Sequence, residues 1–459
     1  MRFDRARFER FVQEKMSKTR LPGLSVALVV DGEVVYARGF GFRDVESGLP
    51  ATPDTLYCVG SVTKSFTALA VMQLVERGLL SLDDPVERYA PLRLSPFGEP
   101  VRIRHLLTHT SGVPALGYAE ALIRSVVGDD SAWMPIASYE DMLSFLSGAE
   151  EWAEARPGER FFYLNEGYVL LGYVIERVSG ERYEDYVRRH ILEPLGMRRS
   201  CFGRGDFERR QDRAVPYVLT KDGGRVRSTY PFGITSDGGL ISSVAELANY
   251  VRMYLGRGEL DGARLVSPKA VEEMETPRVR VPFELLGGEA YGYGWIITPD
   301  FLGHKLVWHS GSVLTSTAFV GYVPDAGLGV AVLANASGYP LSHVGTYVLA
   351  LALGRDPEEL PFIKFDAVLD MLEGRYETYR GTMRVDVVRR GDILFFEWKG
   401  RYTEYVAPLV PEVVEREEAM FYTIRAGRRV EAVFRVREGE IELLYERYKL
   451  KRTGPLPSR

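Results

Sequence analysis

A serine and a lysine lie three residues apart in the stretch CVGSVTKSF, which spans residues 58–66. Apolar residues then recur at helical spacing, so the sequence predicts a helix over 63–77 that Gly78 ends. Residues i and i+3 share one face of a helix, which places the Ser61 hydroxyl beside the Lys64 amine. The helix dipole and partial burial both favour an uncharged amine, which can accept the serine proton. The pair therefore suits acyl transfer by a serine nucleophile.

The Ser-x-x-Lys spacing alone is weak evidence, because it also arises in helices as an N-cap followed by a surface lysine. Two further stretches strengthen it. Tyr163 and Asn165 lie two residues apart before an expected helix over 167–179, and His309 and Gly311 lie two apart in WHSGS. Taken singly, the tyrosine is more simply a half-buried aromatic and the histidine a satisfied strand residue. The three pairs in this order are far more specific than any one of them.

Other candidate sites have simpler explanations. His105 and His109 have the spacing of metal ligands, but the acid of an HExxH motif is missing, so no metal is expected. Ser111 lacks the G-x-S-x-G frame of an α/β-hydrolase. The two cysteines, Cys58 and Cys201, are too few for a disulfide framework or a zinc site, so buried thiols are expected.

Composition narrows the class of protein. A chain of 459 residues is long enough for two or three domains. Its net charge is −5 with both signs interspersed, so the sequence shows no basic patch that would bind nucleic acid or anionic lipid. The sequence contains no apolar run of membrane-spanning length and no secretory leader, so no membrane partner and a cytoplasmic location are expected. Asn and Gln are scarce, with three of each, which is typical of a thermophile.

Periodicity predicts two domains. In residues 1–353, strands at both ends flank a helical middle, which predicts one central antiparallel sheet with helices packed against it. The first two of these strands are joined by Asp31-Gly32, a hairpin signal. Residues 354–365 are polar and contain proline, as expected of a linker. Residues 366–459 alternate in short runs between glycine-containing turns, which predicts a small all-β barrel.

On these motifs the chain resembles the serine β-lactamase and penicillin-binding-protein superfamily, and within it peptidase family S12, the class C β-lactamase-like branch with the CubicO group. The stretches LLTHTSG, SDGGLISSVAELANY and YGYGW look like further family signatures. The β-rich end is similar to the barrel of archaeal CubicO-group serine peptidases. The resemblance therefore implies a β-lactamase-like α/β sandwich, with its antiparallel sheet flanked by helices, followed by a lipocalin-like barrel.

The resemblance implies a role for each motif residue. Ser61 is the nucleophile and Lys64 its proton acceptor, while Tyr163 is the general base and acid that serves the leaving group. Asn165 holds the substrate amide. The implied catalytic residues are Ser61, Lys64, Tyr163 and His309, and the implied substrate-binding residues are Asn165, Gly311 and Ser312.

The last motif departs from the pattern of β-lactamases, which usually carry Lys-Thr-Gly where this chain has His309-Ser310-Gly311. A permanent cation is replaced by a group expected to titrate near neutrality, so capture of a substrate carboxylate is weakened. His309 and Gly311 are expected to line the wall opposite the nucleophile. The N–H groups of Ser61 and Ser312 are expected to form the oxyanion hole.

We therefore expect a serine hydrolase that works through a covalent acyl-enzyme and needs no metal or organic cofactor. The leading hypothesis is a peptidase on short peptides that accepts D-amino acids. An esterase or β-lactamase-like hydrolase is one alternative, and a non-catalytic assembly scaffold with a ligand-binding barrel is another. The resemblance also implies a homo-oligomer, a closed cube-like and self-compartmentalising assembly in which the barrel mediates subunit contacts or shields the active-site mouth.

Overall fold

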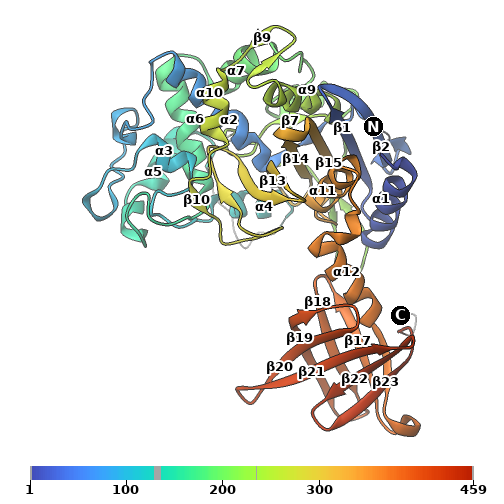
Figure 1. Ribbon diagram of the computed structural model, residues 1–459. Coiled ribbons are helices and arrows are strands. Elements are labelled where there is room, and N and C mark those ends of the chain that lie inside the picture. Colours follow the sequence, from blue (N-terminus) through green and yellow to red (C-terminus); the bar gives the residue numbers. More distant parts are fainter. Residues whose placement is uncertain (1–2, 129–135, 234, 457–459) are drawn as a thin grey trace. The chain divides into compact units, whose positions relative to one another are not determined.

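The computed structural model describes residues 3–128, 136–233 and 235–456 (Figure 1). The chain divides into two compact units, Met1–Arg355 and Asp356–Arg459. Among the helices of the described ranges, none is both long enough and apolar enough to cross a bilayer.

A nine-stranded antiparallel sheet forms the centre of the first unit, with the order β10-β11-β12-β13-β14-β15-β1-β2-β3. Strand β1 near the start of the unit pairs with β15 near its end, with Val26 opposite Val332, so both ends of the segment build one sheet as predicted. The strands are β1 (Gly23–Val30), β2 (Glu33–Asp44), β3 (Leu49–Pro50), β10 (Val279–Arg280), β11 (Ala290–Tyr291), β12 (Ile296–Phe301), β13 (His304–Ser312), β14 (Thr317–Val323) and β15 (Leu328–Ala334).

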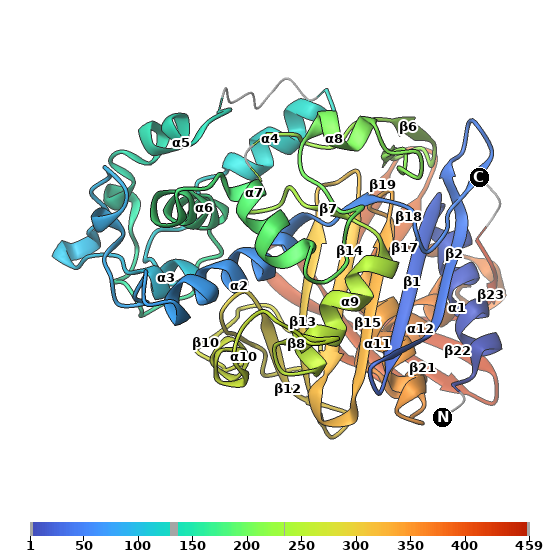
Figure 2. The ribbon, with the colours of Figure 1, turned by 90° about the horizontal axis from the view of Figure 1, so that it is seen from above.

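Helices cover both faces of this sheet (Figure 2). Gly329 of β15 lies against Val251 of α9 (Val244–Leu255), whereas Phe319 of β14 lies against Gly345 of α11 (Leu341–Ala352) on the opposite face. Helix α1 (Arg5–Thr19) packs beside α11. The remaining helices of the unit are α2 (Thr63–Glu76), α3 (Ile103–Leu107), α4 (Tyr118–Val126), α5 (Tyr139–Leu146), α6 (Asn165–Ser179), α7 (Tyr183–Val187), α8 (Arg204–Glu208) and α10 (Pro268–Met274).

Helix α2 is the most deeply buried of these elements, because all but its last two residues are buried. It packs against α6 and contributes Phe66, Leu69 and Val71 to the main apolar core. A helix buried on all sides has little room to move, so α2 provides a fixed base for the residues at its N-terminus. Short two-strand pairs complete the unit: β4 (Tyr57–Cys58) with β7 (Ile241–Ser242), β5 (Tyr217–Leu219) with β6 (Arg225–Arg227), and β8 (Glu259–Leu260) with β9 (Ala263–Arg264).

The second unit is a closed antiparallel barrel of eight strands, which confirms the predicted fold class. Inward-facing side chains such as Val387, Phe421 and Phe434 fill its core. The segment expected to be a linker contains the start of helix α12 (Pro361–Leu372), and α12 adds Leu369 to this core. The barrel strands are β16 (Gly374–Glu377), β17 (Arg384–Arg390), β18 (Ile393–Lys399), β19 (Glu404–Val414), β20 (Glu418–Arg425), β21 (Arg428–Arg437), β22 (Glu440–Tyr445) and β23 (Tyr448–Gly454).

Candidate active site

Ser61 lies in a tight 3₁₀ turn, η1 (Gly60–Val62), just before α2 begins at Thr63. The chain enters this turn from β4 through Gly60, whose φ of +52° falls in the left-handed region that favours glycine. Glycine also permits close packing here, because a Cβ on Gly60 would lie 2.9 Å from the amide nitrogen of Ser312. The turn therefore holds Ser61 against the end of strand β13.

Lys64 is fully buried, and its Nζ has three hydrogen-bond partners. They are Ser61 Oγ at 3.1 Å, Asn165 Oδ1 at 2.7 Å and the carbonyl oxygen of Asp237 at 2.7 Å. Two of the three can only accept hydrogen bonds. An uncharged amine would donate both its hydrogens to those two oxygens and turn its lone pair toward the serine hydroxyl. The lysine is thus held where it can take the serine proton.

Tyr163 lies beside this pair, with its ring centroid 4.9 Å from Lys64 Nζ. The Tyr163 ring also packs against His109, whose ring centroid is 4.1 Å away. The Nδ1 atom of His109 accepts a hydrogen bond from the amide of Leu164, and burial holds the pKa of His109 well below its usual value. His109 is therefore a neutral support for the tyrosine. The other half of the predicted pair, His105, accepts the amide hydrogen of Arg102 at its own Nδ1.

His309 is buried, and its ring has a defined tautomer. The carbonyl oxygen of Ser310 lies 2.6 Å from Nδ1 and can only accept, so Nδ1 carries the hydrogen. The Tyr291 hydroxyl, 2.9 Å from Nε2, then donates to that atom. Burial, with a smaller contribution from the Lys64 charge, lowers the pKa of His309 to about 3. The expectation that this group titrates near neutrality is therefore wrong, since the imidazole is removed from water and lies near the Lys64 charge.

Gly311 allows strand β13 to approach the turn that carries Ser61. A Cβ at this position would lie 2.0 Å from the carbonyl oxygen of Val59 and 2.9 Å from the amide nitrogen of Ser61. No side chain larger than hydrogen fits there. The Gly-Ser dipeptides at 60–61 and 311–312 consequently lie against one another.

These residues surround one cavity of about 670 Å³. Six of the seven predicted site residues line it, and Lys64 reaches two of them by hydrogen bonds from beneath. The lining also includes two acidic residues to which the sequence assigned no role, Glu120 and Asp237, of which Asp237 lies in the stretch SDGGLISSVAELANY. The six are Ser61, Tyr163, Asn165, His309, Gly311 and Ser312.

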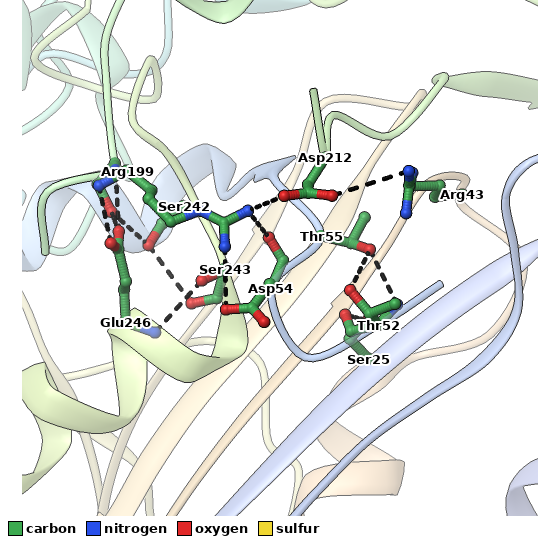
Figure 3. A network of polar contacts seen from close by, with 11 residues as sticks. Ser25, Arg43, Thr52, Asp54, Thr55, Arg199, Asp212, Ser242, Ser243 and Glu246 are labelled. Carbon is green, nitrogen blue, oxygen red and sulfur yellow. Dashed lines mark hydrogen bonds and ion pairs between the residues drawn. The ribbon is translucent and has the colours of Figure 1, made fainter. Parts of the chain in front are cut away.

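A network of polar contacts surrounds Ser242 of β7 and the start of α9 (Figure 3). The Glu246 carboxylate accepts the amide hydrogens of Arg199 and Ser200, each at 2.7 Å, and the Ser243 hydroxyl caps α9 by accepting from the Glu246 amide. Glu246 lies three residues after Ser243, the spacing of a capping box, but its carboxylate accepts from the Arg199 and Ser200 amides of a neighbouring segment. The Arg199 guanidinium extends the network to Asp212 at 2.6 Å.

Comparison with known proteins identifies two families along the chain. Residues 8–354 match the family model described as Beta-lactamase, and residues 357–451 match the model described as Pab87 octamerisation domain. The resemblance inferred from the motifs to the β-lactamase and penicillin-binding-protein superfamily is thereby confirmed.

Solved structures with similar folds span both units. The octameric penicillin-binding protein homologue from Pyrococcus abyssi is 51% identical, with coverage of 98% of this chain and 100% of the other at a TM-score of 0.94. SurE, in a structure with D-Leu, is 25% identical, with coverage of 98% and 99% at a TM-score of 0.59. Protein flp of Staphylococcus aureus (strain MW2) is 27% identical over 71% of this chain, and the match spans only 61% of the length of flp.

Proposed function

Because this chain belongs to the beta-lactamase family, we propose that it is a serine peptidase that cleaves short peptides through a covalent acyl-enzyme on Ser61. The observation that carries the proposal is the arrangement of Lys64 Nζ, 3.1 Å from Ser61 Oγ and held by two obligate acceptors. A lysine fully removed from water is costly to a protein unless its amine is used.

In the proposed first step, Ser61 Oγ attacks the carbonyl carbon of the scissile amide. A carbon–oxygen bond forms while the hydroxyl proton passes to Lys64. The carbon–nitrogen bond then breaks, and Tyr163 delivers a proton to the departing nitrogen. A water molecule attacks the resulting ester in the second step, which releases the acid and returns a proton to Ser61.

The remaining cavity residues would position the substrate. The amides of Ser61 and Ser312 would bind the developing oxyanion, in agreement with the close approach of their two backbone segments. Asn165 donates nothing to Lys64, because its Oδ1 is the acceptor, so its Nδ2 is available to a substrate carbonyl. His309 has both ring nitrogens engaged, so its role would be to shape the wall through Tyr291.

Acceptance of D-amino acids is part of the proposal, supported by the likeness to SurE, whose structure contains D-Leu. An esterase is the second candidate. It is supported by the neutral His309. Without a cation, this wall cannot form an ion pair with the carboxylate of a β-lactam or of a peptide C-terminus. Comparing the turnover of D- and L-alanine p-nitroanilides, p-nitrophenyl esters and a chromogenic cephalosporin separates these activities.

We also propose that the barrel unit assembles the protein into a closed oligomer. The support is the match of residues 357–451 to an octamerisation domain and the likeness to an octameric homologue over the whole chain. Under this proposal the protein is catalytic, and the barrel serves assembly rather than ligand binding.

Covalent labelling tests the nucleophile. A fluorophosphonate probe should add one label to each wild-type chain, and peptide mapping by mass spectrometry should place it on Ser61. The Ser61→Ala variant should remain unlabelled. Ser310→Ala is the matched control, because Ser310 lines the same cavity without a proposed role for its side chain, and its labelling should persist. Undiminished labelling of Ser61→Ala would refute the proposal.

A further inference from the structure

The loop between strands β10 and β11 places an aromatic side chain on the wall of the active-site cavity. Phe283 lines the cavity and is 44% exposed, although its side chain is large and apolar. Its ring lies edge-on to the ring of Phe161, with the two centroids 6.1 Å apart. Ligand cavities are typically lined by apolar and aromatic side chains whose surface a bound molecule covers. Phe283 is therefore available to the substrate.

A buried carboxylate holds this loop in shape. Glu289 is fully buried, and its side chain accepts three consecutive amide hydrogens, at distances of 2.7–3.1 Å, from residues 285–287. Consecutive amides that converge on one anion form a compact nest. The amide of Val281 donates to the carbonyl oxygen of Glu289 at 3.1 Å and closes the base of the loop. The backbone that carries Phe283 is thus fixed before a substrate binds.

The same carboxylate connects the loop to the central sheet. The Thr298 hydroxyl on β12 lies 3.4 Å from the Glu289 carboxylate and 2.9 Å from the indole nitrogen of Trp308 on β13. The indole can only donate, so the hydroxyl accepts from it and donates its own hydrogen to the carboxylate. Trp308 directly precedes His309 of the third motif. The loop is therefore positioned by the strand that forms one wall of the cavity.

The position of Phe283 relative to Tyr163 indicates which part of the substrate it meets. Phe161 packs against Phe283 on one side and lies 6.4 Å, between ring centroids, from Tyr163. Only one ring therefore separates Phe283 from the residue proposed to protonate the departing nitrogen. Groups on this side of the cavity face the part of the substrate that leaves with that nitrogen.

We propose that Phe283 binds an apolar side chain on the residue that leaves with the departing amine, so that the enzyme prefers peptides with a large apolar residue directly after the scissile bond. Glu289 is a positioning residue, because it holds the loop and is fully buried. This inference rests on the proposed acyl-enzyme chemistry and adds a substrate class to it.

Peptides with one acyl residue and different leaving residues provide the test. Alanyl-leucinamide and alanyl-glycinamide, each with D- and L-alanine, release leucinamide or glycinamide, which chromatography separates. The full-length wild type should prefer the leucinamide leaving group at least about tenfold in kcat/KM. Phe283→Ala should reduce this preference to less than about threefold. Phe283→Leu, which keeps an apolar side chain, should retain most of it.

The acyl side of the cavity is tested separately. Alanine and leucine p-nitroanilides share one leaving group and differ only in the acyl residue. Phe283→Ala should change kcat/KM for the two by the same factor. A loss confined to the leucine compound would place Phe283 at the acyl residue and would overturn the inference.

Glu289→Gln tests the positioning role, because a neutral amide has one acceptor oxygen where the carboxylate has two. It should reduce the preference for leucinamide as Phe283→Ala does, and should change the hydrolysis of p-nitrophenyl acetate less than about threefold. Phe97→Ala is the matched control, since this aromatic is 60% exposed and is not one of the described residues that line the cavity. It should leave the preference unchanged.

Equal release of leucinamide and glycinamide by the wild type, or release of neither, would overturn the inference. An undiminished preference in Phe283→Ala would overturn it as well. Fluorophosphonate labelling of Ser61 and hydrolysis of p-nitrophenyl acetate that requires Ser61 keep the proposed chemistry intact in each of these cases. Absence of both would mean that the acyl-enzyme proposal itself has failed.

Discussion

At the scale of single residues, His309 shows how burial decides the charge of a side chain. Imidazole in water titrates near pH 6.5, but here desolvation and the nearby Lys64 charge keep it neutral far below that pH. The third motif therefore provides shape and hydrogen bonding in place of the positive charge that a lysine would bring. The substrates that fit are those with no carboxylate at this wall.

The neutral state of His309 makes stability depend on pH. The pKa is about 3 in the folded protein and near 6.5 in the unfolded chain, so only the unfolded chain binds the proton between these values. Stability is thus lost as the pH falls below about 6.5. Between pH 7 and pH 5, the wild type should lose about 2 kcal/mol more of its free energy of unfolding than His309→Gln. Guanidinium denaturation of both proteins at the two pH values measures this difference, and equal losses would contradict it.

The residues of the three motifs could be identified from spacing because each pair lies within one local stretch. Ser61 and Lys64 share a helix start, and the first hydrogen-bonds to the second as the i, i+3 geometry predicts. Asp237 and Tyr291 could not be assigned in this way. They lie in two of the stretches that look like family signatures, SDGGLISSVAELANY and YGYGW, but their contacts with Lys64 and His309 join residues far apart in the chain.

At the scale of elements, the contact between turn η1 and strand β13 determines the site. The turn belongs to the first hundred residues and the strand to the fourth hundred, yet their backbones meet without an intervening side chain. Glycines at both positions make this approach possible. The oxyanion hole that we propose exists only while these two segments stay in contact.

Gly311→Ala tests this contact. The new Cβ would lie 2.0 Å from the Val59 carbonyl oxygen, a main-chain atom that has little room to move. We expect a loss of about 2–3 kcal/mol in stability, and a fall in kcat for neutral ester substrates of at least about a hundredfold. Thermal denaturation and steady-state kinetics measure the two effects.

Gly205→Ala is the control for this substitution, because its nearest neighbour is the end of the Arg209 side chain at 3.9 Å. It should leave both activity and stability close to wild type. Full activity in Gly311→Ala would show that the approach of strand and turn is not needed.

Long elements with strong periodicity could be predicted closely, while short ones could not. Helix α9 occupies Val244–Leu255, where apolar residues recur at helical spacing directly after the Ser243 cap. The two-residue strands β4 and β7 leave no detectable alternation, although they flank Ser61 and Asp237. Their position is determined by the surrounding polar network in Figure 3, which only the folded chain brings together.

At the scale of the whole molecule, each unit has its own apolar core. The barrel nonetheless exposes large apolar side chains. Tyr402 is 85% exposed, Tyr379 is 78% exposed and Ile424 is 60% exposed. Exposed apolar side chains mark a protein interface where they gather into a patch, so these three are candidates for the contacts of the proposed assembly.

Removal of residues 356–459 should therefore lower the assembly state. Sedimentation velocity should give a smaller particle than the full-length protein, whereas fluorophosphonate labelling of Ser61 should persist because the first unit keeps its own core. Ile424→Asp in the full-length chain is a milder version that leaves the barrel core intact, and it should also reduce the particle mass. An unchanged mass in both proteins would contradict the proposed role of the barrel.

The two-unit architecture could be predicted because the spacing of apolar residues changes between the units. Helix and strand periodicities both occur in the first unit, whereas the second has only short alternating runs. The chain divides between Arg355 and Asp356, inside the segment 354–365 that was expected to be a linker, and that segment also contains the start of α12. The proline and acidic residues near 357–359 look like a linker, but they precede helix α12, whose apolar residues belong to the barrel core. The polar residues of this segment marked where the second unit starts. The helix itself could not be predicted from them, because it packs against barrel strands that lie further along the chain.

The pairing of β1 with β15 also has a consequence during synthesis. Strand β1 ends at Val30, whereas β15 begins at Leu328, so a ribosome translates most of the unit before the two can meet. Until then one edge of an apolar strand stays open to foreign pairing partners. Newly made chains should consequently stay inactive and prone to capture by chaperones until the last sheet strands emerge.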